Sequence, residues 1–456
     1  MSFCTSAITG TDHPAHQPIY VCTACVPPSP DELPPCVCEA CANIIGDHHD
    51  VDFVGVGPCT CDCPSLVEGG LFDDIVAGEL RDLFARSMEE AERLGRSCPR
   101  PLNRPPPAGV DGPSERQPAG GLGGYAFRTF TISDLTERDC ERLVRQATIL
   151  VEHTKDTFWL PGDGSEDESE LCELESLARR VYRQHAEAFD LDRHEGCEWW
   201  VQLKPEGEDR APVDLHFDKD ELLAESFSLG AFPTISTVTY LTGDGPGVAP
   251  TVVFPHTYTD DDEEHGMASV LLSRPTPSKH LAFDGRLLHG APAGAAPSPP
   301  GGEETPSPLR VTFLVNIWPD RPSGTGALPD AVRAAVRGGA LPGGAGRNIP
   351  GLRFDERAVT RLTLDCVGRR NVVLPFVSQG ATWIDDGSAA EDGAADDLGP
   401  EVREDSIDDD ESEEEEGELV LVMPAITTRD MASDSEPGGT LLVSFEGANE
   451  AKLVRR

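Results

Sequence analysis

The stretch VDLHFDKDE, residues 213–221, contains a histidine and an aspartate two positions apart, His216 and Asp218. We expect this stretch to be extended, and side chains two apart on a strand point to the same side of it. One imidazole and one carboxylate would therefore face the same space. Two histidines and one carboxylate form the facial triad that binds non-haem Fe(II) and leaves positions open for oxygen chemistry. The motif supplies two of these three ligands.

A second histidine of the right kind follows in HLAFDGRLLHGAP, residues 280–292. The dipeptide DG separates two apolar runs and predicts a turn between strands. His289 is then presented by the second of these strands and is the expected third ligand. His256 and His280 are alternatives, although a single histidine is more often structural than a ligand.

A cation for a carboxylate ligand lies in RVTFLVNIW, residues 310–318. Arg310 begins this run, and its planar guanidinium can bind a carboxylate through two parallel hydrogen bonds. On a strand Arg310, Thr312, Leu314 and Asn316 would share one face. Arg310 would therefore suit an enzyme of 2-oxoglutarate, which needs a cation for the distal carboxylate of that acid.

Taken together, residues 197–318 resemble the Fe(II)/2-oxoglutarate-dependent dioxygenase superfamily, in particular its prolyl 4-hydroxylase-like branch. The blocks that carry the resemblance are the H-x-D pair at 216–218, STVTYL at 236–241, APTVVF at 249–254, FDGRLLHG at 283–290 and RVTFLVNIW at 310–318. The resemblance implies a double-stranded β-helix, or jelly roll. It also implies that His216, Asp218 and His289 bind iron and that Arg310 holds 2-oxoglutarate.

Nine of the 14 cysteines lie within the first 63 residues. This segment has too few apolar residues to offset the conformational entropy of folding, so we expect bound metal to stabilise it. A C-x-x-C turn brings two thiolates about 3.5–4 Å apart, which fits an edge of a tetrahedral Zn(II) site. The predicted zinc ligands, enough for at least two sites, are Cys4, Cys22, Cys25, Cys38, Cys41, His48, His49, Cys59, Cys61 and Cys63. Cys36 is a further thiol that could substitute.

The order of these residues resembles the UBR box, a zinc domain that reads the amino termini of target proteins. The resemblance covers residues 4–65 and rests on Cys4, YVCTAC at 20–25, CEAC at 38–41, His48-His49 and CDC at 61–63. It implies that acidic side chains hold a positively charged amino terminus. The candidates, which could equally be ordinary solvated charges, are Asp47, Asp50, Asp52 and Asp62.

Beyond the cysteines, helical and strand patterns separate along the chain. A stripe at helical spacing predicts an amphipathic helix within residues 67–97; its members are Leu71, Ile75, Leu80, Leu83, Phe84 and Met88. Ser133 is the expected N-cap of a second helix, and a third is expected over residues 169–189. Short strand-like runs follow from Cys197 onward. The predicted fold class is α+β, a jelly roll with flanking helices, preceded by a small zinc-stabilised domain.

The predicted division of the chain has five parts. They are a UBR-box-like zinc domain over residues 1–66, a helix and Pro/Gly-rich linker over 67–124, a dioxygenase domain with a C-terminal extension over 125–384, an acidic disordered segment over 385–418, and C-terminal strands over 419–456 that dock on the dioxygenase domain. The acidic segment carries 18 Asp and Glu against one Arg, and such a composition favours disorder.

The formal net charge of −44 argues against nucleic acid or an anionic membrane as a partner, because both require a positively charged surface. No apolar run is long enough for a membrane span, and no charged-then-apolar leader opens the chain. We expect a soluble intracellular protein, cytoplasmic or nuclear.

The predicted function is an Fe(II)- and 2-oxoglutarate-dependent dioxygenase that hydroxylates a C–H bond. A protein or peptide side chain is the preferred substrate, because a module that resembles a peptide reader lies on the same chain. One alternative is a UBR-type adaptor or N-degron-binding protein with an inactive oxygenase fold. Another is an oxygenase that acts on a small molecule.

Overall fold

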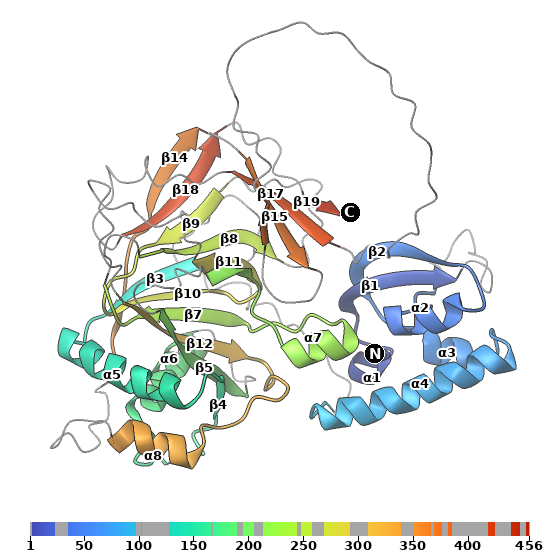
Figure 1. The fold of residues 1–456 in the computed structure, drawn as a ribbon, viewed down its shortest axis with the longest axis horizontal. Coiled ribbons are helices and arrows are strands. Elements are labelled where there is room, and N and C mark those ends of the chain that lie inside the picture. The colour runs from blue at the N-terminus through green and yellow to red at the C-terminus, as the bar shows by residue number, and fades with distance from the viewer. Residues whose placement is uncertain are drawn as a thin grey trace, which may run out of the picture.

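The computed structural model places two large sheets side by side, with helices along one of them and a small amino-terminal module beside them (Figure 1). The structure describes residues 2–22, 35–96, 102, 127–165, 167–188, 195–204, 213–243, 248–257, 269–291, 309–338, 351–365, 369–375, 382–384, 418–424, 439–446 and 453–455. The predicted acidic segment and most of the predicted Pro/Gly-rich linker lie outside these residues.

The larger sheet has seven strands in the order β13-β3-β10-β7-β12-β5-β4, and all neighbours are antiparallel. Its strands are β3 (Phe127–Ile132), β4 (Phe158–Pro161), β5 (Gly196–Lys204), β7 (Ile235–Tyr240), β10 (Lys279–Asp284), β12 (Arg310–Trp318) and β13 (Phe354–Glu356). Four of these strands, β5, β7, β10 and β12, lie in the strand-like runs that the sequence predicted from Cys197 onward.

The second sheet has six strands in the order β14-β18-β9-β8-β11-β6, antiparallel except for the parallel pair of β14 and β18. Its strands are β6 (Val213–His216), β8 (Thr251–Thr257), β9 (Ser269–Ser273), β11 (Leu287–Ala291), β14 (Thr360–Asp365) and β18 (Thr440–Glu446). Through β18, the C-terminal part of the chain pairs with β9. A separate four-stranded sheet contains β15 (Arg369–Pro375), β16 (Thr382–Ile384), β17 (Glu418–Pro424) and β19 (Leu453–Arg455).

The alternation of side chains gives the seven-stranded sheet two different faces. Phe313, Val315 and Ile317 of β12 belong to the core cluster formed with helices α5 (Glu137–His153), α6 (Glu173–Ala188) and α8 (Asp330–Gly338). Val238 and Phe283 belong instead to a cluster shared with residues of the six-stranded sheet. Mixed helices and large antiparallel sheets are thus confirmed, and the space between the two sheets is lined by the even-numbered residues of β12.

Helix α5 begins later than the sequence suggested. Its N-cap is Thr136, whose hydroxyl accepts from the backbone N–H of Asp139 at 3.3 Å, while the Asp139 carboxylate accepts from the backbone N–H of Thr136 at 3.0 Å. The prediction of Ser133 was wrong because this reciprocal capping box satisfies two donors of the first turn, which a lone serine cannot do.

The amino-terminal module contains a two-stranded sheet and four helices. They are α1 (Ser6–Thr9), β1 (Ala15–Cys22), α2 (Glu39–Gly46), β2 (Val51–Cys59), α3 (Cys63–Glu68) and α4 (Asp74–Arg93). Helix α4 buries Val76, Leu80 and Leu83, whereas Leu71, Ile75 and Met88 are 45%, 63% and 38% exposed. The predicted amphipathic helix is confirmed, with Leu80, Leu83 and Phe84 of its apolar stripe in the core. Leu71, Ile75 and Met88 were wrong, because Leu71 precedes the helix and the other two lie off its buried face.

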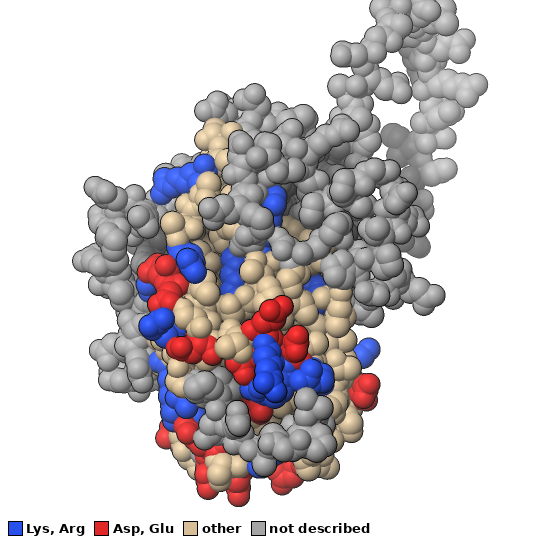
Figure 2. Space-filling view, turned by 90° about the vertical axis from the view of Figure 1, so that its left-hand side faces the viewer, with Lys and Arg blue, Asp and Glu red and all other residues tan. Residues whose placement is uncertain are grey.

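Among the helices of the described residues, none combines the length and the apolar character needed to cross a bilayer. On the face of the molecule shown in Figure 2, the basic and acidic side chains of the described residues lie interspersed. Helix α7 (Glu221–Phe227) follows β6 closely and lies between the two sheets and the amino-terminal module (Figure 1). It links the site described next to that module.

Candidate metal and co-substrate site

The structure brings His216, Asp218 and His289 together. One ligand atom from each lies within 4.8 Å of the others. His216 ends β6 and is the cross-strand partner of His289 on β11, so the two imidazoles share one face, with ring centroids 4.5 Å apart. Asp218 lies beyond the end of β6, where the chain leads into α7. The three residues therefore converge although they come from three different local structures.

Both imidazoles are oriented by the backbone. Nδ1 of His216 lies 2.8 Å from the carbonyl oxygen of Asp214, and Nδ1 of His289 lies 2.9 Å from that of Leu287. A ring that donates from Nδ1 presents the lone pair of Nε2, which is the arrangement of metal-ligating histidines. The two Nε2 atoms lie 3.6 Å and 3.4 Å from the carboxylate oxygens of Asp218. This donor set fits a divalent cation with open coordination positions.

The carboxylate of Asp218 is held in its ionised form. Burial opposes its ionisation, but the neighbouring His289 and His216 and a hydrogen bond from the Ser236 hydroxyl lower the pKa of Asp218 well below its ordinary value. That hydroxyl donates to Oδ2 at 2.7 Å. Burial lowers the pKa of His289 to about 4. Both ligands are therefore in the protonation state that metal binding requires.

Arg310 lies on the inner face of the seven-stranded sheet and is 7% exposed. It donates from Nη1 to Oε1 of Gln202 at 3.1 Å and from Nη2 to Oγ1 of Thr251 at 3.2 Å. Tyr240 donates to the same Thr251 hydroxyl at 2.7 Å. Among the described residues, no carboxylate forms an ion pair with Arg310. A buried cation surrounded only by neutral groups fits an anionic ligand.

Two buried polar atoms near this cation strengthen that fit. Arg310 Nε and the Thr312 hydroxyl are buried and have no hydrogen-bond partner among the described residues. Thr312 is the cross-strand partner of both Gln202 and Tyr240, so it shares the inner face with them. A carboxylate would supply the missing acceptors. The residues present therefore fit the distal carboxylate of 2-oxoglutarate.

The pairing of β7 with β12 relates the position of the three metal-ligand candidates to that of Arg310. Asn316 pairs with Ser236, whose hydroxyl holds Asp218, and Thr312 lies four residues earlier on the same face of β12. At about 3.4 Å per residue, the rows of Asn316 and Thr312 are roughly 14 Å apart along the strand. The long side chain of Arg310 and the metal ligands thus line one continuous inner surface.

Several residues of this surface were not predicted as site residues from the sequence. Besides Ser236, Thr312 and Gln202, they include Glu198, the cross-strand partner of Asn316. Its carboxylate accepts from Nε1 of Trp318 at 3.0 Å, and burial raises the pKa of Glu198 to about 7. Strand alternation could have identified these residues once the inner face of β12 was known.

The alternative histidines do not join the triad. His280 points to the opposite face of the seven-stranded sheet, where its Nε2 lies 2.9 Å from Nε2 of His185 on α6. Its Nδ1 lies 2.8 Å from the hydroxyl of Thr239. His256 lies on β8 with its ring 6.3 Å from that of Phe217. Side chains alternate between the two faces of a strand. Because Leu281 and Phe283 of β10 face inward, His280 faces outward.

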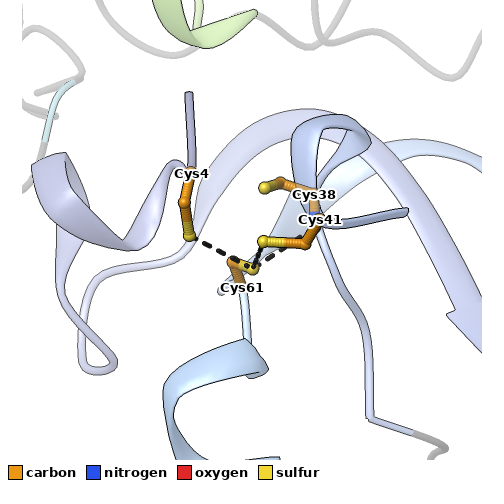
Figure 3. A group of neighbouring side chains, drawn as sticks. All are labelled: Cys4, Cys38, Cys41 and Cys61. Atoms are coloured by element: carbon orange, nitrogen blue, oxygen red, sulfur yellow. Dashed lines mark hydrogen bonds between the residues drawn. The ribbon is translucent and has the colours of Figure 1, made fainter. Parts of the chain in front are cut away.

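A second group of metal-ligand type lies in the amino-terminal module. The side chains of Cys4, Cys38, Cys41 and Cys61 point toward one another (Figure 3), with ligand atoms within 4.8 Å. Sγ of Cys61 lies 3.8 Å from that of Cys4 and 3.8 Å from that of Cys41. These separations fit the edge of a tetrahedron with metal–sulfur bonds of about 2.3 Å. We call these four residues the thiol group.

The electrostatics of the thiol group agree with a metal site. Burial opposes ionisation of Cys61, but hydrogen bonds from Cys38 and Cys41 lower the pKa of Cys61 to about 6. The pKa values of Cys4 and Cys41 are raised by their neighbouring thiols. Four buried thiols that cannot all ionise on their own fit a cation that neutralises the thiolates.

The other predicted zinc ligands are distributed differently. Sγ of Cys63 lies 3.4 Å from that of Cys4, at the edge of the thiol group. Cys59 interacts with Cys36, and Nε2 of His48 lies 3.6 Å from a carboxylate oxygen of Glu79. Cys22 is buried and His49 is partly buried, both outside the thiol group. Cys25 lies outside the described residues.

The chain has no match among protein-family models or curated proteins. Solved structures similar to it include a prolyl-4-hydroxylase from Pseudomonas putida, at 15% identity and a TM-score of 0.26, covering 42% of this chain and 92% of that chain. AviO1 from Streptomyces viridochromogenes Tue57 is 17% identical with a TM-score of 0.28, covering 45% and 92%. The viral collagen prolyl hydroxylase vCPH from Paramecium Bursaria Chlorella virus-1 is 12% identical with a TM-score of 0.26, covering 46% and 98%. At identities and TM-scores this low, the similarity carries no argument about function, which has to be inferred from the side chains of this chain.

Proposed function

We propose that the chain is an Fe(II)- and 2-oxoglutarate-dependent dioxygenase with a jelly-roll fold. The observation that carries the proposal is the convergence of His216, Asp218 and His289 on the same inner surface as the unpaired buried cation Arg310. Fe(II) with 2-oxoglutarate would supply the oxidation of a C–H bond by O2, with release of succinate and CO2 and formation of an alcohol. A protein side chain is the proposed substrate.

Within this proposal each side chain has a defined task. His216 and His289 would bind the iron through Nε2, because their Nδ1 atoms already donate to backbone carbonyls. Ser236 restrains the orientation of Asp218. Arg310 and Thr312 would hold the distal carboxylate of 2-oxoglutarate and so orient the molecule along the sheet. The apolar ring of Phe283 packs 4.9 Å from that of His289.

For the amino-terminal module we propose structural zinc, bound by Cys4, Cys38, Cys41 and Cys61. The four thiols and their separations support zinc over a harder cation, because soft thiolate ligands favour it. The proposed division of the chain keeps the predicted zinc domain over residues 1–66 and the dioxygenase domain over 125–384. Recognition of peptide amino termini by the module remains part of the proposal and is separable from the oxygenase activity.

The proposal is tested by the release of succinate from 2-oxoglutarate. The purified chain with added Fe(II) and ascorbate should convert 2-oxoglutarate to succinate in the presence of O2, at a slow rate even without substrate. His216→Ala and Asp218→Ala should each abolish this release, because two ligands alone do not hold Fe(II) in an oxygenase site. His153→Ala is the matched control, because His153 is exposed on α5.

The outcome is decided by comparing these variants. Succinate release that persists in both ligand variants would contradict the proposed iron site. No succinate from the wild-type chain under any of these conditions, with the metal and 2-oxoglutarate shown to bind, would favour a binding protein with an inactive oxygenase fold. Peptide arrays with different amino-terminal residues test the module separately.

A further inference from the structure

The amino-terminal module packs directly on α7, which begins three residues after Asp218. The backbone N–H of Phe3 donates to the carbonyl of Ser226 at 2.9 Å. The rings of Phe3 and Phe227 lie 5.6 Å apart. One buried apolar cluster contains residues of both parts, among them Ala7, Ile8, Ala91, Leu94, Leu223, Phe227 and Leu229. The module is therefore part of the same packed body as the site.

A buried ion pair adds to this apolar contact. Helix α4 ends at Arg93 with Leu94 as its C-cap. Gly95 follows with a φ of 75°, and the backbone N–H of Arg96 donates to the carbonyl of Ala91 at 2.7 Å. This 6→1 hydrogen bond and the left-handed glycine define a Schellman motif, which turns the chain sharply at the helix end. Arg96 leaves this turn toward α7 and is 4% exposed.

The nearer ion-pair partner of Arg96 is Asp220, the N-cap of α7. Asp320, which follows β12, lies 3.8 Å from Nη1 of Arg96. Nη2 of Arg96 donates to Oδ2 of Asp220 at 2.9 Å, and neither side chain is more than 4% exposed. Asp220 also accepts from the backbone N–H of Leu223 at 3.1 Å and from the N–H and hydroxyl of Ser323, each at 2.8 Å. Asp220 thus ties α7, the segment after β12 and the amino-terminal module together, two residues from the ligand Asp218.

The thiol group reaches the same helix by a short path. Cys4 directly follows Phe3, and its backbone N–H donates to the Ser87 hydroxyl of α4 at 2.8 Å. Leu80 and Leu83 of α4 belong to the core cluster that contains Cys4, Cys38, Cys41 and Cys61. A cation in the thiol group would therefore fix both Phe3 and α4, the two parts of the module that contact α7.

We propose that the thiol module positions the iron ligand Asp218 through α7, with Arg96 as the positioning residue, so that metal in the thiol group strengthens metal binding at the triad. This inference rests on the proposed function of the triad. The coupling is reciprocal by linkage, so metal at the triad also strengthens metal binding in the thiol group. The module then acts as a support of the oxygenase site, whether or not it also reads peptides.

The test uses Mn(II) as the probe of the triad in the full-length, zinc-loaded chain, with free Mn(II) measured by electron paramagnetic resonance. Arg96→Met should weaken Mn(II) binding about tenfold, the lower end of what loss of an outer-shell partner of a metal ligand costs. Arg86→Met is the matched control, because Arg86 is exposed on the same helix and its Nε donates within α4, to the carbonyl of Asp82 at 3.4 Å. It should bind Mn(II) within about twofold of the wild type.

The measurements are made well below the melting temperature of each variant, where a merely destabilised chain is still folded and binds Mn(II) normally. Arg96→Lys retains the charge and should recover part of the affinity. If Arg96→Met does not fold, the Mn(II) affinities of Arg96→Lys and Arg86→Lys are compared instead. Equal Mn(II) affinity of the Arg96 and Arg86 variants would overturn the coupling. A wild-type chain that binds Mn(II) no better than His216→Ala would instead overturn the proposed iron site, and the coupling with it.

Discussion

At the scale of single residues, the polar atoms left without partners indicate what the site binds. The proposed metal ligands are oriented by the protein, since both imidazoles and Asp218 have protein hydrogen bonds. Arg310 Nε and the Thr312 hydroxyl lack a partner among the described residues. Buried polar groups without partners are costly in a folded protein. Arg310 Nε and the Thr312 hydroxyl lie on the same face, so we attribute both to the binding of a carboxylate that would accept from them.

This reasoning predicts the effect of Arg310→Lys. Lysine keeps the charge but loses the planar fork, so 2-oxoglutarate should bind at least about tenfold more weakly, a difference of about 1.4 kcal/mol. Calorimetric titration of 2-oxoglutarate into the Mn(II)-loaded chain measures this loss. Arg86→Lys, exposed in the middle of α4, should leave the affinity unchanged. An unchanged affinity in Arg310→Lys would place the distal carboxylate elsewhere.

The sequence predicted the residues whose chemistry is rare and missed those whose chemistry is common. His216, Asp218, His289 and Arg310 were found because few side chains can bind iron or a carboxylate in those patterns. Ser236 is an ordinary strand residue, and only the register of β7 with β12 shows that it faces the site; Thr312 was placed on the face of Arg310 but not predicted to bind. The thiol group also needed the structure, because spacing alone did not show which four of the cysteines converge.

At the scale of elements, the close approach of β6 and β11 sets the distance between the two histidine ligands. A Cβ added at Gly290 would lie 2.8 Å from the backbone oxygens of both Val213 and Asp214. These are backbone atoms, and the oxygen of Asp214 also accepts from His216. The glycine after His289 is therefore required for the strand contact that aligns the ligands.

Gly290→Ala should consequently push β6 away from β11 and separate His216 from His289. We expect Mn(II) affinity to fall about tenfold or more, since changes to the groups that orient metal ligands have effects of that size. Gly338→Ala is a matched control, because a Cβ there meets nothing within 4 Å. If Gly290→Ala binds Mn(II) as tightly as this control, the strand spacing does not govern the site.

The packing of α6 on the outer face of the seven-stranded sheet should respond to pH. Burial lowers the pKa of His185 to about 3 and that of His280 well below its ordinary value of 6.5. The unfolded chain then binds more protons than the folded chain below about pH 6.5. The stability that these neutral rings provide is complete above that pH and falls below it by about 1.4 kcal/mol per pH unit for each ring.

Denaturant unfolding between pH 7.5 and pH 5 measures this dependence. His185→Gln removes one titrating ring while its amide can still hydrogen-bond Nε2 of His280, so the free energy of unfolding should fall less steeply with acid than in the wild type. Identical slopes in the two proteins would show that His185 does not stay neutral in the folded chain.

At the scale of the whole molecule, the structure changes the relation between the two predicted modules. The sequence suggested a zinc domain tethered by a Pro/Gly-rich linker. Composition identifies an extended linker, but it does not show whether the domains on either side of the linker contact each other. Arg96 and Asp220 are 124 positions apart and each is unremarkable in sequence. Their pairing, and the apolar cluster around α7, become visible only when the chain is folded.

A chain that starts at residue 125, the boundary predicted from sequence, should therefore not behave as an independent domain. It would expose Leu223, Phe227 and Leu229, which are at most 1% exposed in the full chain, and burial of each such side chain is worth about 1.5–3 kcal/mol. It would also leave the buried carboxylate of Asp220 without Arg96. We expect a lower melting temperature and aggregation relative to the full chain, measured by calorimetry and light scattering.

Removing residues 2–3 alone, which deletes Phe3 and its contacts with Ser226 and Phe227, should cause a smaller loss in the same direction. A truncated chain as stable and monodisperse as the full one would show that the contact with α7 contributes nothing, and that the two modules are joined only by the covalent chain.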